Sequence, residues 1–281
     1  MWSHRWVLSV AIVVVLLAVV SLPVITLYKH WTAATALESR NSFGLQYEQP
    51  PLGAWINRNW YTKLFGTVPH VYFGNTEVSI GDAIHLHRLR GLRSLAFNGC
   101  TDEVWVKLPT HLTSLNLLQN DLPPSAIAWE QIGKMQRLGS LSIDGVQRDP
   151  MSAPPNVAIK PHWSVDDAFL SAVANKPRLK GLYLIELSIP RPVLRKLLKQ
   201  TPHLEILDLG GVRGLTEEDL VLIQQHGAVQ SLALDNVDLT VGCIEQIATM
   251  NSLKIFCSEG LSTNLASKLR ALRPDLEIET N

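Results

Sequence analysis

The sequence is poor in cysteine and has no excess of charge of either sign, and both features exclude classes of protein. It has three cysteines in 281 residues, Cys100, Cys243 and Cys257, too few for the disulfide framework of a small secreted domain. The sequence neither predicts nor excludes a disulfide bridge between Cys243 and Cys257. Lys plus Arg equals Asp plus Glu, at 25 each. Because nucleic-acid-binding proteins carry an excess of basic residues against phosphate, we expect no nucleic-acid partner.

Motifs of the common enzyme families are missing as well. The chain has no Gly-x-Ser-x-Gly elbow, Walker A loop, His-Glu-x-x-His helix or Cys-x-x-Cys pair. His85 and His87 alternate as two metal ligands on a strand would, but they fall in a polar stretch expected to be helical. The acidic runs at Asp166-Asp167 and Glu217-Glu218-Asp219 precede helical patterns, where carboxylates act as caps. The sequence therefore predicts no enzyme activity, no metal and no cofactor.

What the sequence does contain is, first, a long apolar run near its amino terminus. Trp6 to Leu27 carries no charged residue, and a helix of this length measures about 33 Å, enough for a hydrocarbon core of about 30 Å. Trp6 and Tyr28 stand at its ends, as aromatic residues do at membrane interfaces. We predict a transmembrane helix over residues 6–28. The alternative is a cleaved signal peptide, which normally has a shorter apolar region.

The charges beside this run carry little information about orientation. Arg5 precedes the run and Lys29 follows it, so the positive-inside rule favours neither side. A leader as short as residues 1–5 is expected to stay in the cytoplasm. We therefore predict a single-pass membrane protein whose remaining chain is extracytoplasmic. Protease accessibility in intact cells distinguishes this arrangement from a cytoplasm-facing one.

The rest of the chain repeats a unit of the form apolar-x-x-apolar-x-apolar, in which the last two apolar residues share one face of a strand. The copies are Val68-Val71-Phe73, Leu92-Leu95-Phe97, Leu112-Leu115-Leu117, Leu138-Leu141-Ile143, Leu179-Leu182-Leu184, Leu204-Leu207-Leu209, Val229-Leu232-Leu234 and the degenerate Leu253-Phe256. Successive copies start 20 to 26 residues apart, except for one spacing of 41. Such regular spacing predicts a solenoid.

The segments between these strands show helix signals and one interruption. Thr216 stands three residues before Asp219 and ahead of an apolar pattern, as in a capping box. Pro190 opens a second helical pattern, as proline does in a first turn. The long spacing holds a proline-rich stretch, residues 148–164, which we interpret as an inserted loop.

These repeats resemble the leucine-rich repeats of bacterial proteins, whose pattern is LxxLxLxxTxVTDxxL. Val229 to Ile244 reads VQSLALDNVDLTVGCI and keeps most of its apolar positions. Leu37 to Glu48 and Trp55 to Gly66 resemble the N-terminal cap of membrane-anchored repeat proteins from planctomycete-like bacteria. The resemblance implies an α/β solenoid, a curved parallel β-sheet with outer helices, over residues 67–281, and a juxtamembrane segment and cap over residues 29–66. It also implies partner binding rather than one activity.

A binding surface follows from the repeat frame, because residues between and beside the apolar strand positions point to the concave side. We expect Tyr183, Ile185 and Ile206 to form an apolar patch there, with Asp208 beside it. The full set of candidate partner-binding residues is Tyr183, Ile185, Ile206, Asp208, Leu118, Asp144 and Asp235. The alternative is that the insertion, with Met151 and Trp163, covers the patch as intramolecular packing.

These observations together predict a membrane-anchored protein–protein interaction module whose protein partner the sequence does not identify. A cytoplasm-facing anchored scaffold, or a substrate-receptor adaptor, is the alternative. A hydrolase built on the repeats is the less favoured third possibility.

Overall fold

The structure is a computed structural model that describes residues 4–38, 44–48, 67–74, 77–118, 123–145, 163–174, 176–212 and 214–280, with residues 4–20, 47 and 48 as backbone only. Its strands are β1 (Gly44–Glu48), β2 (Thr67–Tyr72), β3 (Ser94–Phe97), β4 (Ser114–Leu117), β5 (Ser140–Asp144), β6 (Gly181–Ile185), β7 (Ile206–Asp208), β8 (Ser231–Ala233), β9 (Ile255–Cys257) and β10 (Glu277–Glu279). Its helices are α1 (His4–Glu38), α3 (Ile80–Leu86), α4 (Asp102–Lys107), α5 (Ala126–Lys134), α6 (Asp167–Val173), α7 (Arg191–Gln200), α8 (Glu217–His226), α9 (Val241–Ala248) and α10 (Thr263–Leu272).

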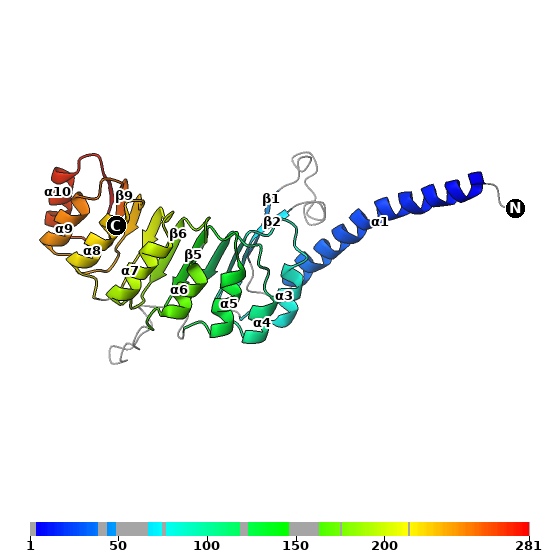
Figure 1. The fold of residues 1–281 in the computed structure, drawn as a ribbon, viewed down its shortest axis with the longest axis horizontal. Coiled ribbons are helices and arrows are strands. Elements are labelled where there is room, and N and C mark those ends of the chain that lie inside the picture. The colour runs from blue at the N-terminus through cyan, green and yellow to red at the C-terminus, as the bar shows by residue number, and fades with distance from the viewer. Residues whose placement is uncertain are drawn as a thin grey trace.

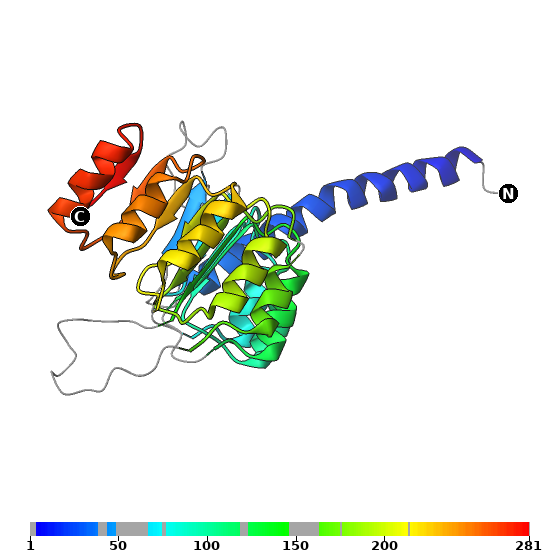
Figure 2. The same ribbon diagram turned by 60° about the vertical axis from the view of Figure 1, so that its left-hand side comes forward.

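The strands form one sheet in chain order, from β1 to β10. Strands β2 to β10 are parallel to one another, and β1 pairs antiparallel with β2. The helices that return the chain lie along one side of this sheet (Figures 1 and 2). The predicted α/β repeat fold is thereby confirmed as a long parallel sheet with helices on one face, resembling a leucine-rich-repeat solenoid.

Strand register follows the repeat frame predicted from the sequence. Leu115 pairs with Leu95 on one side and with Leu141 on the other, and Leu207 pairs with Leu182 and Leu232. These second apolar residues of each unit are fully buried. Burying one leucine side chain contributes about 1.5–3 kcal/mol, so an aligned leucine ladder contributes much of the stability of the stack.

One position of the frame requires an unusual backbone conformation. The residue seven places after the first apolar residue has a left-handed φ in four later units: 55° at Glu186, 67° at Gly211, 55° at Asn236 and 81° at Gly260. The chain turns off the strand at this point. Glycine and asparagine adopt this conformation most easily, so Glu186 is the costly member of the series.

Neighbouring units are also joined by side chains that bond the carbonyl groups at helix ends. Lys176 Nζ donates to the carbonyl oxygens of Ile132, at 2.8 Å, and Met135, at 3.1 Å, where α5 ends. Arg273 donates to the carbonyl of Met250, at 2.9 Å, beyond the end of α9. These carbonyls lie at or beyond helix ends, and each accepts one local amide hydrogen bond. The next unit in the stack adds a second hydrogen bond to each.

Carboxylates cap the helix starts, as the sequence predicts. Asp166 accepts hydrogen bonds from the amides of Ala168 and Phe169 at the start of α6, both at 3.0 Å. Thr216 and Asp219 form the predicted capping box of α8. These acidic groups therefore have structural roles.

The amino-terminal helix α1 covers the predicted span and continues to Glu38. Within the residues whose side chains the structure describes, no helical segment has the length and apolar character needed to cross a membrane. The predicted cap residues 49–66 and the insertion up to residue 162 lie outside the described residues. The three cysteines are free thiols in the structure, so no bridge joins Cys243 to Cys257.

Two glycines of this framework should respond to alanine with opposite signs. A Cβ at Gly145 would lie 2.5 Å from Leu187 Cδ2 and 2.7 Å from the backbone oxygen of Glu186. We expect Gly145→Ala to lower the free energy of unfolding by about 1–3 kcal/mol. Gly133, in α5, has no such neighbour closer than 3.9 Å, so Gly133→Ala should raise it by about 0.4–1 kcal/mol. Urea unfolding of both variants measures the difference, and equal effects would contradict this account of the packing.

Candidate functional site

The predicted binding residues lie on the sheet face opposite the helices. The alternation of side chains along each strand puts Tyr183 and Ile185 of β6 on the same face as Ile206 and Asp208 of β7. Ile206 is exposed, and Leu118, Asp144, Tyr183, Ile185, Asp208 and Asp235 are half-buried. All seven candidates therefore keep some access to solvent.

Strand register brings Tyr183 close to Ile206. Gly181 pairs with Ile206, and Tyr183 pairs with Asp208. The Tyr183 ring leans over Gly181, since a Cβ on that glycine would lie 3.1 Å from Tyr183 Cε2. The missing side chain at residue 181 thus leaves room for the ring beside the Ile206 strand. Ile185 pairs with Asp144 instead and lies at the far end of the same strand.

A cavity of about 350 Å³ opens beside these two residues and extends over β8 to β10. It is lined by Tyr183, Ile206, Leu207, Asp208, Ser231, Ala233, Asp235, Cys257, Ser258, Glu259 and Glu279. We call it the acidic cavity, because four lining residues are Asp or Glu and none is Lys, Arg or His. One wall is apolar and the rest is acidic and polar.

The lining carboxylates are held by local hydrogen bonds. Asp208 Oδ1 accepts from the amide of Gly210, at 2.9 Å, and Asp235 Oδ1 accepts from the amide of Glu259, at 2.6 Å. The Cys257 thiol donates to Glu279 Oε2, at 3.1 Å. These bonds orient the acidic groups but add no positive charge to the cavity.

Burial and nearby negative charge both raise the pKa values of three lining groups. Burial, with Asp235 adding to it, raises the pKa of Asp208 above its usual range, although the Gly210 amide opposes the rise. Burial and the nearby Asp208 also raise the pKa of Tyr183. Burial, together with Glu279, Asp235 and Asp208, raises the pKa of Cys257 to about 12. The thiol is therefore protonated at neutral pH, and a cation would relieve the repulsion among these groups.

Glu279 is a member of this site that the repeat pattern in the sequence does not predict. The residue stands in β10, whose apolar pattern is too short to set its frame, and only the pairing of Glu279 with Cys257 places it on the cavity side. Trp163 was expected to cover the patch if the insertion folds inward. Instead, its ring packs 6.4 Å from that of the core residue Trp129 of α5, on the helix side of the sheet.

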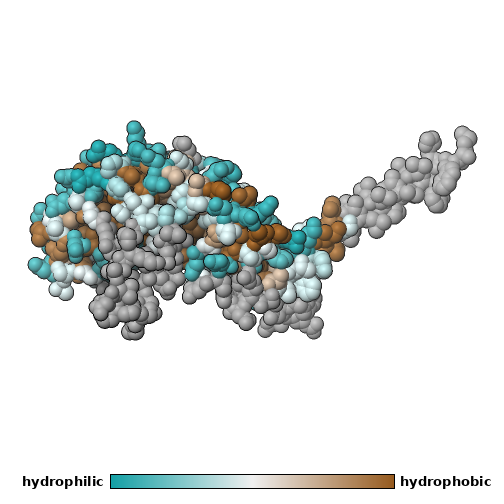
Figure 3. Space-filling model, turned by 90° about the horizontal axis from the view of Figure 1, so that it is seen from below, coloured by the Kyte–Doolittle hydropathy of each residue, from teal (hydrophilic) through white to brown (hydrophobic). Residues whose placement is uncertain are grey.

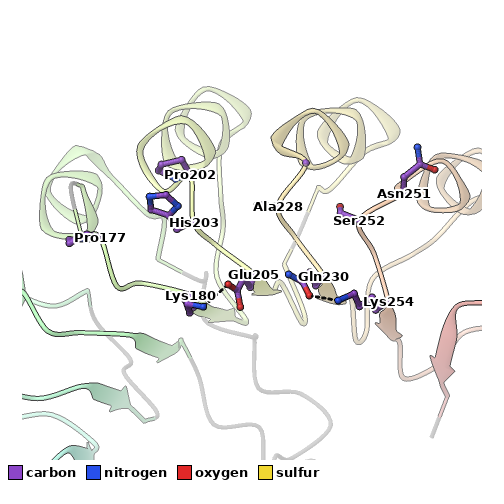
Figure 4. Close-up of a pocket in the computed structure, with 11 residues that line it drawn as sticks. Pro177, Lys180, Pro202, His203, Glu205, Ala228, Gln230, Asn251, Ser252 and Lys254 are labelled. Atoms are coloured by element: carbon purple, nitrogen blue, oxygen red, sulfur yellow. Dashed lines mark hydrogen bonds and ion pairs between the residues drawn. The ribbon is translucent and has the colours of Figure 1, made fainter.

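A second cavity, of about 600 Å³, opens at the sheet edge where helices turn into strands (Figure 4). Its base carries one residue from each of four successive units. Lys180 pairs with Glu205, at 2.7 Å, and Lys254 Nζ donates to Gln230, at 2.8 Å. Because these charged and polar groups pair across neighbouring units, we assign them to the stacking of repeats. Exposed pairs of this kind contribute little stability each.

The histidine pair that the sequence singled out lies at α3. His87 follows the helix, and its Nε2 is 2.7 Å from the carbonyl oxygen of Lys107 in the next unit. Among the residues that the structure describes, no group of three or more His, Cys, Asp or Glu is arranged to hold a metal ion. The structural contact explains His87 without a ligand.

Comparison with known proteins adds little to this geometry. No family model matches the chain, and no curated protein matches it. A solved structure of an internalin from Listeria monocytogenes is similar, with 17% sequence identity and a TM-score of 0.46, over 75% of this chain and 52% of that one. The chain therefore spans about half the length of that internalin. The repeat architecture rests on the strands and register described above.

Replacing one carboxylate of the acidic cavity should make the protein more stable. The raised pKa of Asp208 means that its stabilising contribution is complete below the unfolded pKa and is lost as pH rises through the folded one. We expect Asp208→Asn to be more stable than the unchanged protein at pH 7, with the difference vanishing near pH 3. The amide oxygen keeps the Gly210 contact. Chemical unfolding at both pH values checks this, and Asp238→Asn, at an exposed aspartate, should show no such gain.

Proposed function

We propose that this protein is a membrane-anchored leucine-rich-repeat module that binds a protein partner in the acidic cavity. The observation that carries the proposal is the combination of Tyr183 and Ile206 with four carboxylates in one hollow of the open sheet face. Its lining suits a segment that carries Lys or Arg beside an apolar side chain. The long stem of either basic residue packs on apolar surface while its charged end reaches acidic groups.

The energetics favour such a partner over a purely apolar one. Aromatic side chains in a partly enclosed position often dominate the binding energy of an interface. The carboxylates contribute mainly to specificity and to the rate of association, because they attract basic segments and repel acidic ones. Their mutual repulsion in the free protein is relieved only when positive charge arrives, so affinity should fall as salt rises.

An aspartate in place of Ile206, in the apolar wall of the cavity, should weaken partner binding without unfolding the protein. Ile206 is already 37% exposed, so Ile206→Asp buries no new charge in the core. We expect it to reduce partner recovery at least about tenfold, equivalent to 1.4 kcal/mol. Cross-linking in native membranes, followed by quantitative pull-down of the full chain, measures the recovery.

Ile127 of α5 is the matched control, because it is 40% exposed and lies on a helix away from the cavity. Ile127→Asp should leave recovery unchanged. Equal loss in both variants would indicate a general effect of added charge. Loss of cooperative unfolding in Ile206→Asp alone would show that the patch is core, and the proposed site would be wrong.

The membrane attachment is part of the same proposal, and it is supported by the uncharged run from Trp6 to Leu27 within α1. We place the repeat domain outside the cytoplasm. Protease added to intact cells should then degrade residues 67–280 while leaving a short membrane-bound fragment. Protection in intact cells with cleavage only after lysis would favour the cytoplasm-facing scaffold instead.

A further inference from the structure

Helix α1 belongs to the repeat domain as well as to the apolar run. Near its carboxyl end, His30, Ala33, Ala34 and Leu37 are all fully buried. Their spacing of three and four residues puts them on one face of the helix. The two alanines allow close approach to the core, which α1 joins next to α3. The last turns of α1 thus occupy the place of a helix in the stack.

A hydrogen bond to the first unit fixes the helix further. The amide of Arg90 donates to His30 Nδ1, at 3.0 Å, although the two residues are 60 positions apart. The strand that follows α1, β1, pairs antiparallel with β2 and covers its open edge. Both contacts involve residues that follow Lys29 in the chain. Helix α1 therefore packs directly against the first unit and is not joined to it through a flexible linker.

Upstream of this contact the helix has the opposite character. Leu22, Val24, Ile25 and Tyr28 are 65%, 58%, 47% and 60% exposed, and they fall on more than one face. The hydroxyl of Thr26, in the same stretch, donates to the Leu22 carbonyl within the helix, at 2.8 Å. Figure 3 shows apolar side chains where α1 leaves the repeat domain. A helix that is apolar all round is suited to lipid.

Along α1, the exposed apolar stretch and the part buried in the repeat domain are only two residues apart. Tyr28 directly follows the apolar run and His30 is the first residue buried in the domain, about 3 Å further along the helix axis. Tyr28 and Trp31 lie beside each other at this junction, with ring centroids 6.2 Å apart. Tyrosine and tryptophan favour the membrane interface, where one end of each side chain is apolar and the other is hydrated.

We propose that α1 is a rigid strut: one continuous helix is both the membrane span and the cap of the solenoid, with the lipid headgroups at Tyr28 and Trp31. This inference rests on the membrane attachment proposed above. Figures 1 and 2 both show α1 leaving at the first unit and pointing away from the later ones. The stack therefore extends away from the bilayer.

The strut places the acidic cavity at a set height. Neighbouring strands are about 4.8 Å apart, so the five steps from β2 to β7 place Ile206 about 24 Å beyond the first unit. A binding segment must be presented at this height. The expected partners are therefore proteins that carry a basic segment close to the bilayer surface, such as the membrane-proximal part of another anchored protein.

The test uses the full chain in phosphatidylcholine vesicles, with its three cysteines replaced and nitroxide labels at Leu22→Cys and Asn264→Cys. Both positions are exposed. Pulsed electron resonance should give a narrow distance distribution. A six-residue Gly-Ser insertion between Lys29 and His30 should broaden it by about 13 Å, the mean span of such a linker. The same insertion after Ser3, outside the labelled interval, should leave the distribution narrow.

A second measurement locates the junction in the bilayer. A nitroxide at Trp31→Cys should report headgroup depth, whereas the label at position 264 should be fully aqueous. If alkaline carbonate washes the chain from the vesicles, the membrane attachment itself fails and the strut with it. If the chain is retained but the distribution is already broad without an insertion, or the label at position 31 is fully aqueous, the attachment stands and only the strut is wrong.

Discussion

The structure depends on in-register parallel pairing between units that cannot bury their own apolar faces. Each unit presents a strand of three to six residues, and its leucines are covered only when the next unit aligns with it. A slip of one residue would turn every leucine to solvent, so the register is strongly specified. Because each contact is with an adjacent unit, stability is a sum of neighbour terms along the stack.

Polar side chains divide into two groups under this constraint. Those at the helix ends and at the sheet edge pair between units, as Lys176 does with the carbonyls of α5 and Lys180 with Glu205. Those on the open face also bond between units at two points, Asp235 with the Glu259 amide and Cys257 with Glu279, but no positive charge lines the cavity beside them. The acidic cavity is built from this second group, and its uncompensated charge is a cost to the free protein that a basic partner would offset.

At the amino-terminal end, no preceding repeat unit is available to cover the apolar face of the first one. The first strand of a solenoid needs cover on its outer side, and here α1 and β1 provide it. The covering helix continues from the apolar run, so the segment that closes the solenoid is also the one proposed as its membrane anchor. In the proposed arrangement the docked helix would hold the repeats at one height and orientation, whereas a flexible tether would let them search a wide volume.

The sequence by itself determined the repeat frame, the repeat strands β2 to β9, the caps of α6 and α8, and the face that carries Tyr183, Ile206 and Asp208. These features depend on residues close in sequence, through the period of two in strands and the hydrogen bonds of a single helix turn. Only the tertiary structure decided that Glu279 joins the acidic cavity, that Trp163 packs on the opposite side, and that α1 extends to Glu38. Each of these depends on contacts between residues distant in sequence, such as His30 with Arg90. A local sequence pattern cannot specify such contacts, because it contains no information on which segments become neighbours at the ends of the stack.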